Sequence, residues 1–402
     1  MAAILKSFTA ESASTAQSTD AKLQAAVLEA RQRSLTWYKS MQAPGQPAGV
    51  LRVSAAHDPQ RWPGMLLPGT YNGLMGQALI GGLGQLDAAG RHALAQWLLR
   101  QRREDGVFRL PGMQDADVFK KDDPAETWRY IDFHLTNYSL GALQCVAPRQ
   151  AAVLQFAQPF LQPQHLLAWL ALRDLRDPWQ EGNNIVNLGS FLLLLREQDP
   201  QRWSLPVQQA LELLFAWHDR LQEPATGFWG VGQASDPLQA LHAMAGSMHN
   251  YHLWYATGRA LPYQDKAVDY CLTQAPALHS ACIDVDLVDL LVHADWQIGR
   301  RRAEVRQWLR TLLPELLAFQ NPDGGFADIR DGAGIAPRRQ DGWVNGYAEP
   351  QGLSNTFATW FRWIAIAMIS RNLWPGWNAF PGGWQFRRMI GIGYCRTPAV
   401  TQ

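Results

Sequence analysis

The sequence predicts an all-α protein, and three observations lead to this prediction. Amphipathic windows of helical length recur about twelve times along the chain, whereas the period-two alternation of half-buried strands is almost absent. Hydrophobic residues make up 47% of the 402 positions, so these windows have enough apolar surface to build a large core. The windows centre near residues 30, 78, 95, 139, 164, 190, 212, 252, 269, 289, 311 and 362.

Start and stop signals support several of these helices, taken here in chain order. Asp20 is expected to cap a helix that runs to about Met41, where a loop rich in proline and glycine follows. A turn-rich stretch then leads to an apolar helix from about Gly73, and another helix is expected over about 87–102. Ser204, followed by a proline two positions later, is expected to open the helix near residue 212.

The chain is expected to form one domain over residues 20–390, between a flexible tail at 1–19 and a short tail at 391–402. The first tail is rich in Ala, Ser and Thr and lacks the apolar run of a signal peptide, and no window reaches the length of a membrane span. The 4 cysteines are scattered, which favours a reducing compartment and predicts a cytoplasmic protein. Lys+Arg 36 against Asp+Glu 35 leaves a net charge of +1, which predicts no nucleic-acid partner.

A loop pattern occurs three times, each time at the end of an amphipathic window. Residues 102–108, 222–229 and 320–326 each carry a Gln or Arg, then a glycine, then an aromatic residue two positions after the glycine. A glycine just past a helix end can adopt the left-handed conformation that a β-carbon disfavours. We interpret the loops as an internal repeat rather than as unrelated glycine caps. Each is followed by a segment of aromatic and polar residues, at 132–138, 249–255 and 354–363.

The stretch 280–293 places three carboxylates in an otherwise apolar run. On a helix, Asp286, Asp289 and His293 fall at i, i+3 and i+7 and share one stripe. Asp284 lies near the helix start, where a carboxylate is favoured. Two interpretations remain open. Asp284 could cap the helix with the other acids solvated, or the acids could line a pocket, where burial raises a carboxyl pKa and leaves a proton to donate.

The loop pattern resembles the Gln-x-x-x-Gly-x-Trp repeat of terpenoid cyclases and protein prenyltransferase β subunits. Gln320, Gly324 and Phe326 match it with Phe for Trp, and the loops at 222–229 and 102–108 match it with an insertion or with substitutions. The resemblance implies an α/α toroid of about six helical hairpins around a central cavity.

The acidic stretch adds to this resemblance. In class II terpenoid cyclases, a DxDD motif supplies the acid that protonates an alkene or epoxide. Asp284 and Asp286 match its first two acids, Leu287 stands in place of the last, and Asp289 lies nearly one turn further on. The resemblance implies an enzyme that cyclises a hydrophobic isoprenoid substrate, with Asp286 as the general acid beside Asp284 and Asp289. The residues expected to bind substrate in an aromatic-lined cavity are Tyr71, His134, Tyr138, His249, Tyr251, His252, Trp254 and Trp360.

Two other functions stay open. Helical-hairpin toroids also host glycosidases, polysaccharide lyases and sugar epimerases, which use carboxylates, histidine and tyrosine. The side chains that could serve this chemistry are Asp284, Asp286, Asp289, Glu349 and His249. A toroid can also bind a hydrophobic ligand or a protein partner without catalysis, with the acids in a structural role.

No cofactor is expected, and no metal. His249 and His252 lie three positions apart on one helix, a spacing that can bind a metal or line a cavity wall, but no third ligand stands out. Cys282 and Asp284 do not follow the order of the prenyltransferase zinc site, so Mg or Zn has no further support. The stretch 373–388, rich in Trp and Gly, is expected to pack across the toroid, to cover its cavity or to contact a membrane surface. Nothing in the sequence indicates an oligomeric state.

Overall fold

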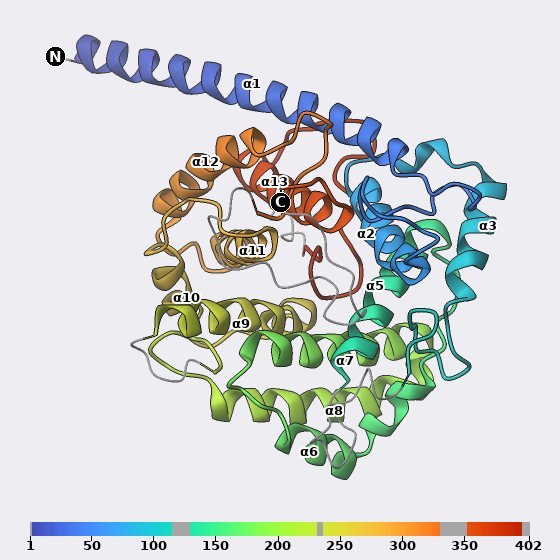
Figure 1. Ribbon diagram of the computed structural model, residues 1–402. Helices are drawn as coiled ribbons and strands as arrows, with labels where there is room; N and C mark the ends of the chain where they lie inside the picture. Colours follow the sequence, from blue (N-terminus) through green and yellow to red (C-terminus); the bar gives the residue numbers. More distant parts are fainter. Residues whose placement is uncertain (1, 115–128, 231–235, 330–351, 396–402) are drawn as a thin grey trace.

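The computed structural model describes residues 2–114, 129–230, 236–329 and 352–395, with side chains from residue 18 onward (Figure 1). These residues form helices and no strand, so the all-α prediction is confirmed. Every predicted window centre lies inside a helix. The helices are α1 (Ala2–Ser40), α2 (Leu66–Leu79), α3 (Ala88–Leu99), α5 (Tyr130–Val146), α6 (Pro163–Ala171), α7 (Pro178–Gln198), α8 (Pro200–Leu221), α9 (Pro237–Thr257), α10 (Gln264–Cys271), α11 (Ala281–Gln297), α12 (Arg302–Ala318) and α13 (Thr356–Leu373).

Alternate helices form an inner layer. α2 packs on α5, α5 on α7, α7 on α9, α9 on α11, α11 on α13, and α13 again on α2, so the order of contacts closes on itself. α3, α8, α10 and α12 pack on the outside of this layer, and Figure 1 shows them around its rim. An inner helix is buried on nearly every side because it has neighbours on every side, and in α11 Ala281 is followed by buried residues up to Asp295 with Cys282 as the exception. The outer α8 is amphipathic instead, with Leu211 and Leu214 buried and Gln208 and Glu212 exposed.

The inner helices α7 and α9 run parallel and approach closely where glycines lie between them. A β-carbon at Gly182 of α7 would lie 2.3 Å from the carbonyl oxygen of Gly246 in α9, and a β-carbon at Gly189 would lie 2.2 Å from Leu253. Gly182 faces Gly246 and Gly189 faces Leu253, so residue numbers increase in the same direction along the two helices, which are therefore parallel. Larger residues at these glycines would therefore push the two inner helices apart.

We expect Gly246→Ala to lower the free energy of unfolding by about 1–3 kcal/mol, the usual cost of overpacking a close contact. The new β-carbon would stand 2.1 Å from the carbonyl oxygen of Pro178, a backbone atom that can move only with α7. Denaturant unfolding measures the loss. Gly84→Ala is the matched control, because a β-carbon there meets nothing within 4 Å. Equal stability of the two variants would contradict the close approach of α7 and α9.

The three repeat loops share the same contact with the inner layer. Gly106, Gly227 and Gly324 have φ angles of 104°, 78° and 97°. The aromatic residue after each donates its backbone N–H to a hydroxyl on the following inner helix, at 2.9 Å in every case. These pairs are Phe108 with Thr136 of α5, Trp229 with Ser247 of α9, and Phe326 with Thr359 of α13. Each loop therefore fastens the end of an outer element to an inner helix.

The glutamines of the pattern close their own loops, and a fourth copy appears that the sequence did not reveal. Gln222 and Gln320 donate side-chain hydrogen bonds to the carbonyl oxygens of their glycines at 2.7 and 2.9 Å. In the fourth copy, the Leu51 N–H donates to Thr70 of α2 at 3.0 Å. Gln42 accepts from the N–H of the glycine at position 49. This fourth copy was missed because its loop is longer and ends in an aliphatic residue.

Several helix boundaries differ from their predictions. α1 begins at Ala2, so Asp20 lies inside this helix, where its carboxylate pairs with Arg310 of α12. The segment 2–40 contains no glycine or proline, and its alanines favour helix, which explains why it continues through the expected tail. α2 begins at Leu66 rather than at Gly73, because its proline falls in the first turn, where proline is tolerated. α3 begins close to its predicted start, after Asp87 as its N-cap, but ends at Leu99 rather than near 102.

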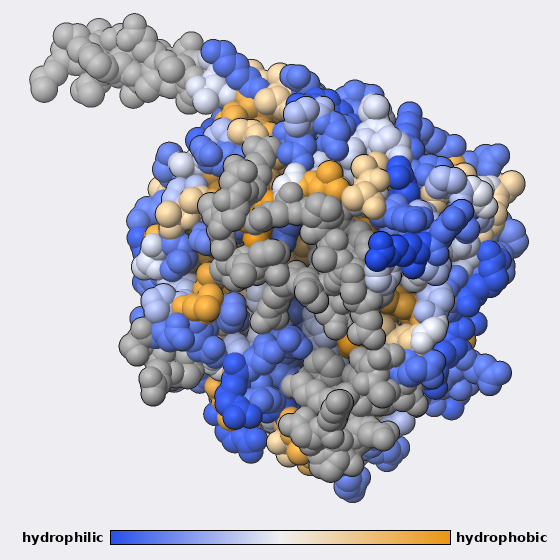
Figure 2. Space-filling model, in the orientation of Figure 1, coloured by the Kyte–Doolittle hydropathy of each residue, from blue (hydrophilic) through white to orange (hydrophobic). Residues whose placement is uncertain are grey.

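The end of the chain is not a simple tail. Ile392 and Cys395 are buried at 3% and 8% exposure, so residues 391–395 pack into the molecule. The division into a tail at 1–19, a domain at 20–390 and a tail at 391–402 otherwise stays a prediction. No helix in the described residues is long and apolar enough to cross a membrane. Figure 2 shows hydrophilic residues over most of the described part of one face.

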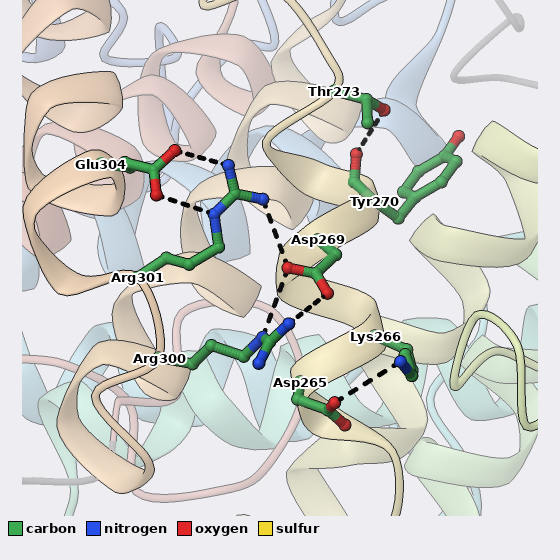
Figure 3. A network of polar contacts seen from close by, with 8 residues as sticks. All are labelled: Asp265, Lys266, Asp269, Tyr270, Thr273, Arg300, Arg301 and Glu304. Atoms are coloured by element: carbon green, nitrogen blue, oxygen red, sulfur yellow. Dashed lines mark hydrogen bonds and ion pairs between the residues drawn. The ribbon is translucent and has the colours of Figure 1, made fainter.

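An exposed network of charges joins α10 to the turn between α11 and α12 (Figure 3). Asp269 accepts hydrogen bonds from Arg300 at 2.7 Å and from Arg301 at 3.2 Å, and Arg301 also pairs with Glu304. Arg301 has a φ of 49°, an uncommon conformation for a residue with a side chain. Exposed ion pairs contribute little stability each, so we assign this network a local role in holding the turn.

Candidate functional site

The three acids of the 280–293 stretch, all on α11, are buried, which rules out the solvated interpretation. Asp284, Asp286 and Asp289 have exposures of 1%, 0% and 2%. α11 begins with Ser280 as its N-cap, so Asp284 is not the cap. A buried carboxylate requires partners or must keep its proton, and the three acids differ in this respect.

Asp284 is held in an ion pair. Arg362 of α13 donates to one of its oxygens, and the backbone N–H of His279 donates to the other at 2.9 Å. The same arrangement recurs at two other inner helices, where an acid in the first turn pairs with an arginine. Asp132 of α5 pairs with Arg109 at 2.6 Å, and Glu181 of α7 pairs with Arg173 at 3.0 Å. Asp284 therefore follows a structural pattern of the inner helices, and its expected catalytic role stays a prediction.

Asp289 is the acceptor at the centre of a histidine pair. Nε2 of His252 in α9 lies 3.1 Å from both carboxylate oxygens, and Nδ1 of His293 lies 2.9 Å from one of them. Burial opposes ionisation of Asp289, but His293 and His252 outweigh it and hold the pKa of this carboxyl below its usual range. Asp289 is thus an anion buried inside the inner layer.

Asp286 has no such partners. Both of its carboxylate oxygens are buried and lack a hydrogen bond within the described residues. Burial raises the pKa of Asp286 well above its usual value, and the nearby carboxylates of Asp289 and Asp284 raise it further. Burial and the neighbouring carboxylates thus both favour the protonated form of Asp286, which is the form that can donate a proton.

Aromatic rings from three other inner helices gather on the same interior. The ring of Tyr138 in α5 lies 5.4 Å from that of Tyr71 in α2 and 5.5 Å, edge to face, from that of Trp360 in α13. Burial raises the pKa of Tyr138 and the nearby Arg387 lowers it; Asp286, when ionised, adds a smaller rise, so the two side chains are within electrostatic range across the inner layer. The structure thus brings these three predicted lining residues together.

The predicted histidines belong to the same interior. His134 of α5 lies 4.3 Å from the Tyr138 ring. Burial lowers the pKa of His249 in α9 to about 3, and the nearby His252 and His134 add to this effect. Burial also lowers the pKa of His134 to about 3. Both histidines are therefore neutral at physiological pH and can act as hydrogen-bonding groups.

Two predicted lining residues lie elsewhere. The hydroxyl of Tyr251 donates to the carbonyl oxygen of Gly227 in a repeat loop at 2.6 Å. The ring of Trp254 lies 4.8 Å from Phe215 of α8. These contacts fill the layer between α8 and α9, so we do not retain Tyr251 and Trp254 as cavity residues. At about 100° per residue, Tyr251 and Trp254 lie on nearly the opposite side of α9 from His249 and His252, which is why they face outward.

The prediction missed the contribution of asparagines and of the chain end. Asn137 of α5 donates to Asn187 of α7 at 2.6 Å and to the carbonyl oxygen of Ile390 at 3.3 Å. Arg387 donates to Asn137, and its guanidinium lies 5.3 Å from the centroid of the Tyr138 ring. The expectation that 373–388 packs across the inner layer is close to this result, but no spacing rule pointed to Arg387. Glu349 lies outside the described residues.

Three of these side chains could be taken for a metal site. The ligand atoms of His252, Asp289 and His293 all lie within 4.8 Å of one another. Both imidazoles, however, are engaged with the Asp289 carboxylate, so we treat the three as a hydrogen-bonded triad. The prediction that the protein uses no metal or cofactor stays a prediction.

No protein-family model and no curated protein matches the chain. Function is therefore inferred from the chemistry of the site itself.

Proposed function

We propose that the protein is an acid-initiated enzyme with an α/α-toroid fold, similar to the terpenoid cyclases, and that Asp286 is its proton donor. One observation carries the proposal: both carboxyl oxygens of Asp286 are buried without a hydrogen-bond partner among the described residues, within electrostatic range of Tyr138. The closed order of inner-helix contacts and the outer helices around it support the toroid. The repeat loops, with their glycines and aromatic residues, support the likeness to this superfamily.

The reaction that suits this site is protonation of an isoprenoid alkene. The O–H of Asp286 transfers its proton to one alkene carbon, the π bond breaks, and positive charge forms on the other carbon, where a second double bond attacks to close a ring. Loss of a proton from the cyclised cation completes the product. The faces of Tyr71 and Trp360 would stabilise a desolvated cation by about 1–2 kcal/mol each. Burial of the site keeps water from capturing it.

A carbohydrate substrate is the second candidate, and a specific observation favours it. The interior carries the polar groups of Asn137, Asn187 and His249, and the cation of Arg387 already occupies the ring of Tyr138. Hydroxyl groups of a sugar would satisfy such groups better than an isoprenoid. In that case the neutral Asp286 would protonate a glycosidic oxygen as a general acid.

Incubation in D2O distinguishes the two candidates. With farnesyl or geranylgeranyl diphosphate, we expect a cyclic product that retains its diphosphate and contains one deuterium at the protonated carbon. Conversion of an oligosaccharide, with no effect on either prenyl diphosphate, would favour the second candidate. Failure of both substrate classes would reject acid-initiated catalysis on them. Mass spectrometry of the products measures each outcome.

A further inference from the structure

The end of the chain enters the inner layer and contacts four of its helices. We call residues 385–395 the C-terminal segment. The N–H of Gln385 donates to Leu79 of α2 at 3.1 Å, Arg387 binds Asn137 of α5, and Gly393 packs against Trp360 of α13. Figure 1 shows this red segment within the circle of helices. The fourth contact is with α9, and it reaches the triad of His252, Asp289 and His293.

The backbone N–H of Gly391 donates to Nδ1 of His252 in α9 at 3.1 Å. Nδ1 is therefore an acceptor without a proton, and the proton of the imidazole must be on Nε2. Nε2 faces both oxygens of Asp289, so its N–H donates to this carboxylate. A proton on Nδ1 would point at the N–H of Gly391, so the contact selects the tautomer with its proton on Nε2.

His293, the second histidine of the triad, also directs an N–H at the carboxylate of Asp289. Nδ1 of His293 lies 3.0 Å from the backbone carbonyl oxygen of Asp289 and 2.9 Å from its carboxylate. Both neighbours are acceptors, so Nδ1 of His293 carries a proton. Asp289 thus receives two imidazole N–H groups, and its negative charge lies one helical turn from Asp286.

We propose that His252 is a positioning residue set by the C-terminal segment: Gly391 fixes its tautomer, its Nε2–H stabilises Asp289 as an anion, and that anion keeps the proton on Asp286. The catalytic meaning of this arrangement rests on the proposed function, but the tautomer and the protonation states do not. A metal ion on Nε2 would move the proton of His252 to Nδ1, against the N–H of Gly391, so the arrangement also opposes a metal site here.

Nitrogen NMR of the intact protein tests the tautomer directly. The chain has 10 histidines, so selective 15N labelling gives a tractable spectrum, and His252→Gln identifies the signals of His252. We expect an unprotonated Nδ1 and a protonated Nε2 near neutral pH, and no change when Zn²⁺ is added. A proton on Nδ1, protonation of both nitrogens, or a stoichiometric shift with Zn²⁺ would overturn the proposal.

A pair of glycine variants tests the role of the C-terminal segment. Gly391 has a φ of 114°, so Gly391→Ala should displace its N–H and give His252 a mixture of tautomers. Gly382→Ala is the control, since Gly382 has a φ of 87° and no atom lies within 4 Å of the new β-carbon. The control should keep the wild-type signals of His252. Unchanged signals in both variants would show that Gly391 does not set the tautomer.

Two substitutions at position 252, each to a residue with an amide side chain, test the hydrogen bond to Asp289 separately from the one with Gly391. The amide of His252→Gln can replace Nε2–H toward Asp289, whereas that of His252→Asn can replace only Nδ1. We expect the infrared C=O band of protonated Asp286, identified by its loss in Asp286→Asn, to persist in His252→Gln and to weaken in His252→Asn. Turnover should be at least about tenfold lower in His252→Asn than in His252→Gln. A tenfold change is what a change of about one unit in the pKa of Asp286 would produce. Equal bands in the two variants would refute the link, whatever the substrate proves to be, whereas an active Asp286→Asn would refute only the proposed function.

Discussion

Asp286→Asn should lower turnover of the substrate by about 10²–10⁴-fold, the usual contribution of a general acid. Asparagine keeps the shape of the side chain and removes the proton that the reaction needs. Asp286 forms no ion pair or hydrogen bond with the described residues, so its replacement breaks neither kind of interaction. The thermal unfolding temperature should therefore stay equal to that of the wild type or rise. Steady-state kinetics and a thermal melt measure the two effects. Full activity in this variant would show that Asp286 is not the acid.

The same variant should change the dependence of stability on pH. The unfolded carboxyl ionises near pH 3.9, whereas folded Asp286 keeps its proton to a higher pH. Its contribution is fully present below the unfolded pKa and is lost as pH rises toward the folded pKa, by about 1.4 kcal/mol per pH unit. Asp286→Asn lacks this term, so the difference between wild type and variant should grow over that interval. Parallel stability curves would mean that Asp286 is ionised in the folded protein.

Asp284→Asn, the same substitution two positions away, should instead lower the free energy of unfolding. It leaves the guanidinium of Arg362, which is 1% exposed, without its carboxylate, and loss of one partner from a buried ion pair costs about 3–5 kcal/mol. Denaturant unfolding measures this loss. Replacement of both partners, in Asp284→Asn with Arg362→Met, should recover much of it because no uncompensated charge remains. A loss under about 1 kcal/mol would indicate that the pair is hydrated.

Together the two aspartate variants separate structure from chemistry on one helix. Asp284 and Asp286 are close in sequence and both buried, yet one is paired and the other is not. A stable, inactive Asp286→Asn beside an unstable Asp284→Asn is the result that supports the site as described. Instability of both variants would mean that the whole acidic cluster is a structural network.

Local features of the chain were sufficient to predict the helices. The periodicity of apolar residues reports which side of a helix meets the core, and every window centre lies in a helix of the structure. The repeat loops were also visible, because a glycine in the left-handed region and an aromatic residue beyond it are requirements of the loop itself. The stripe of Asp286, Asp289 and His293 was a local inference of the same kind, since all three are on α11.

Only the tertiary structure decided what each of these side chains does. Arg362, which neutralises Asp284, is 78 positions away, and His252, which holds Asp289, is 37 positions from it. Gly391, whose N–H orients His252, is 139 positions further along the chain. Tyr251 and His252 are adjacent and equally buried, yet one meets a repeat loop and the other meets Asp289. Helical periodicity places a residue on a face, but the protonation state of a buried acid depends on the donors that other helices bring to it.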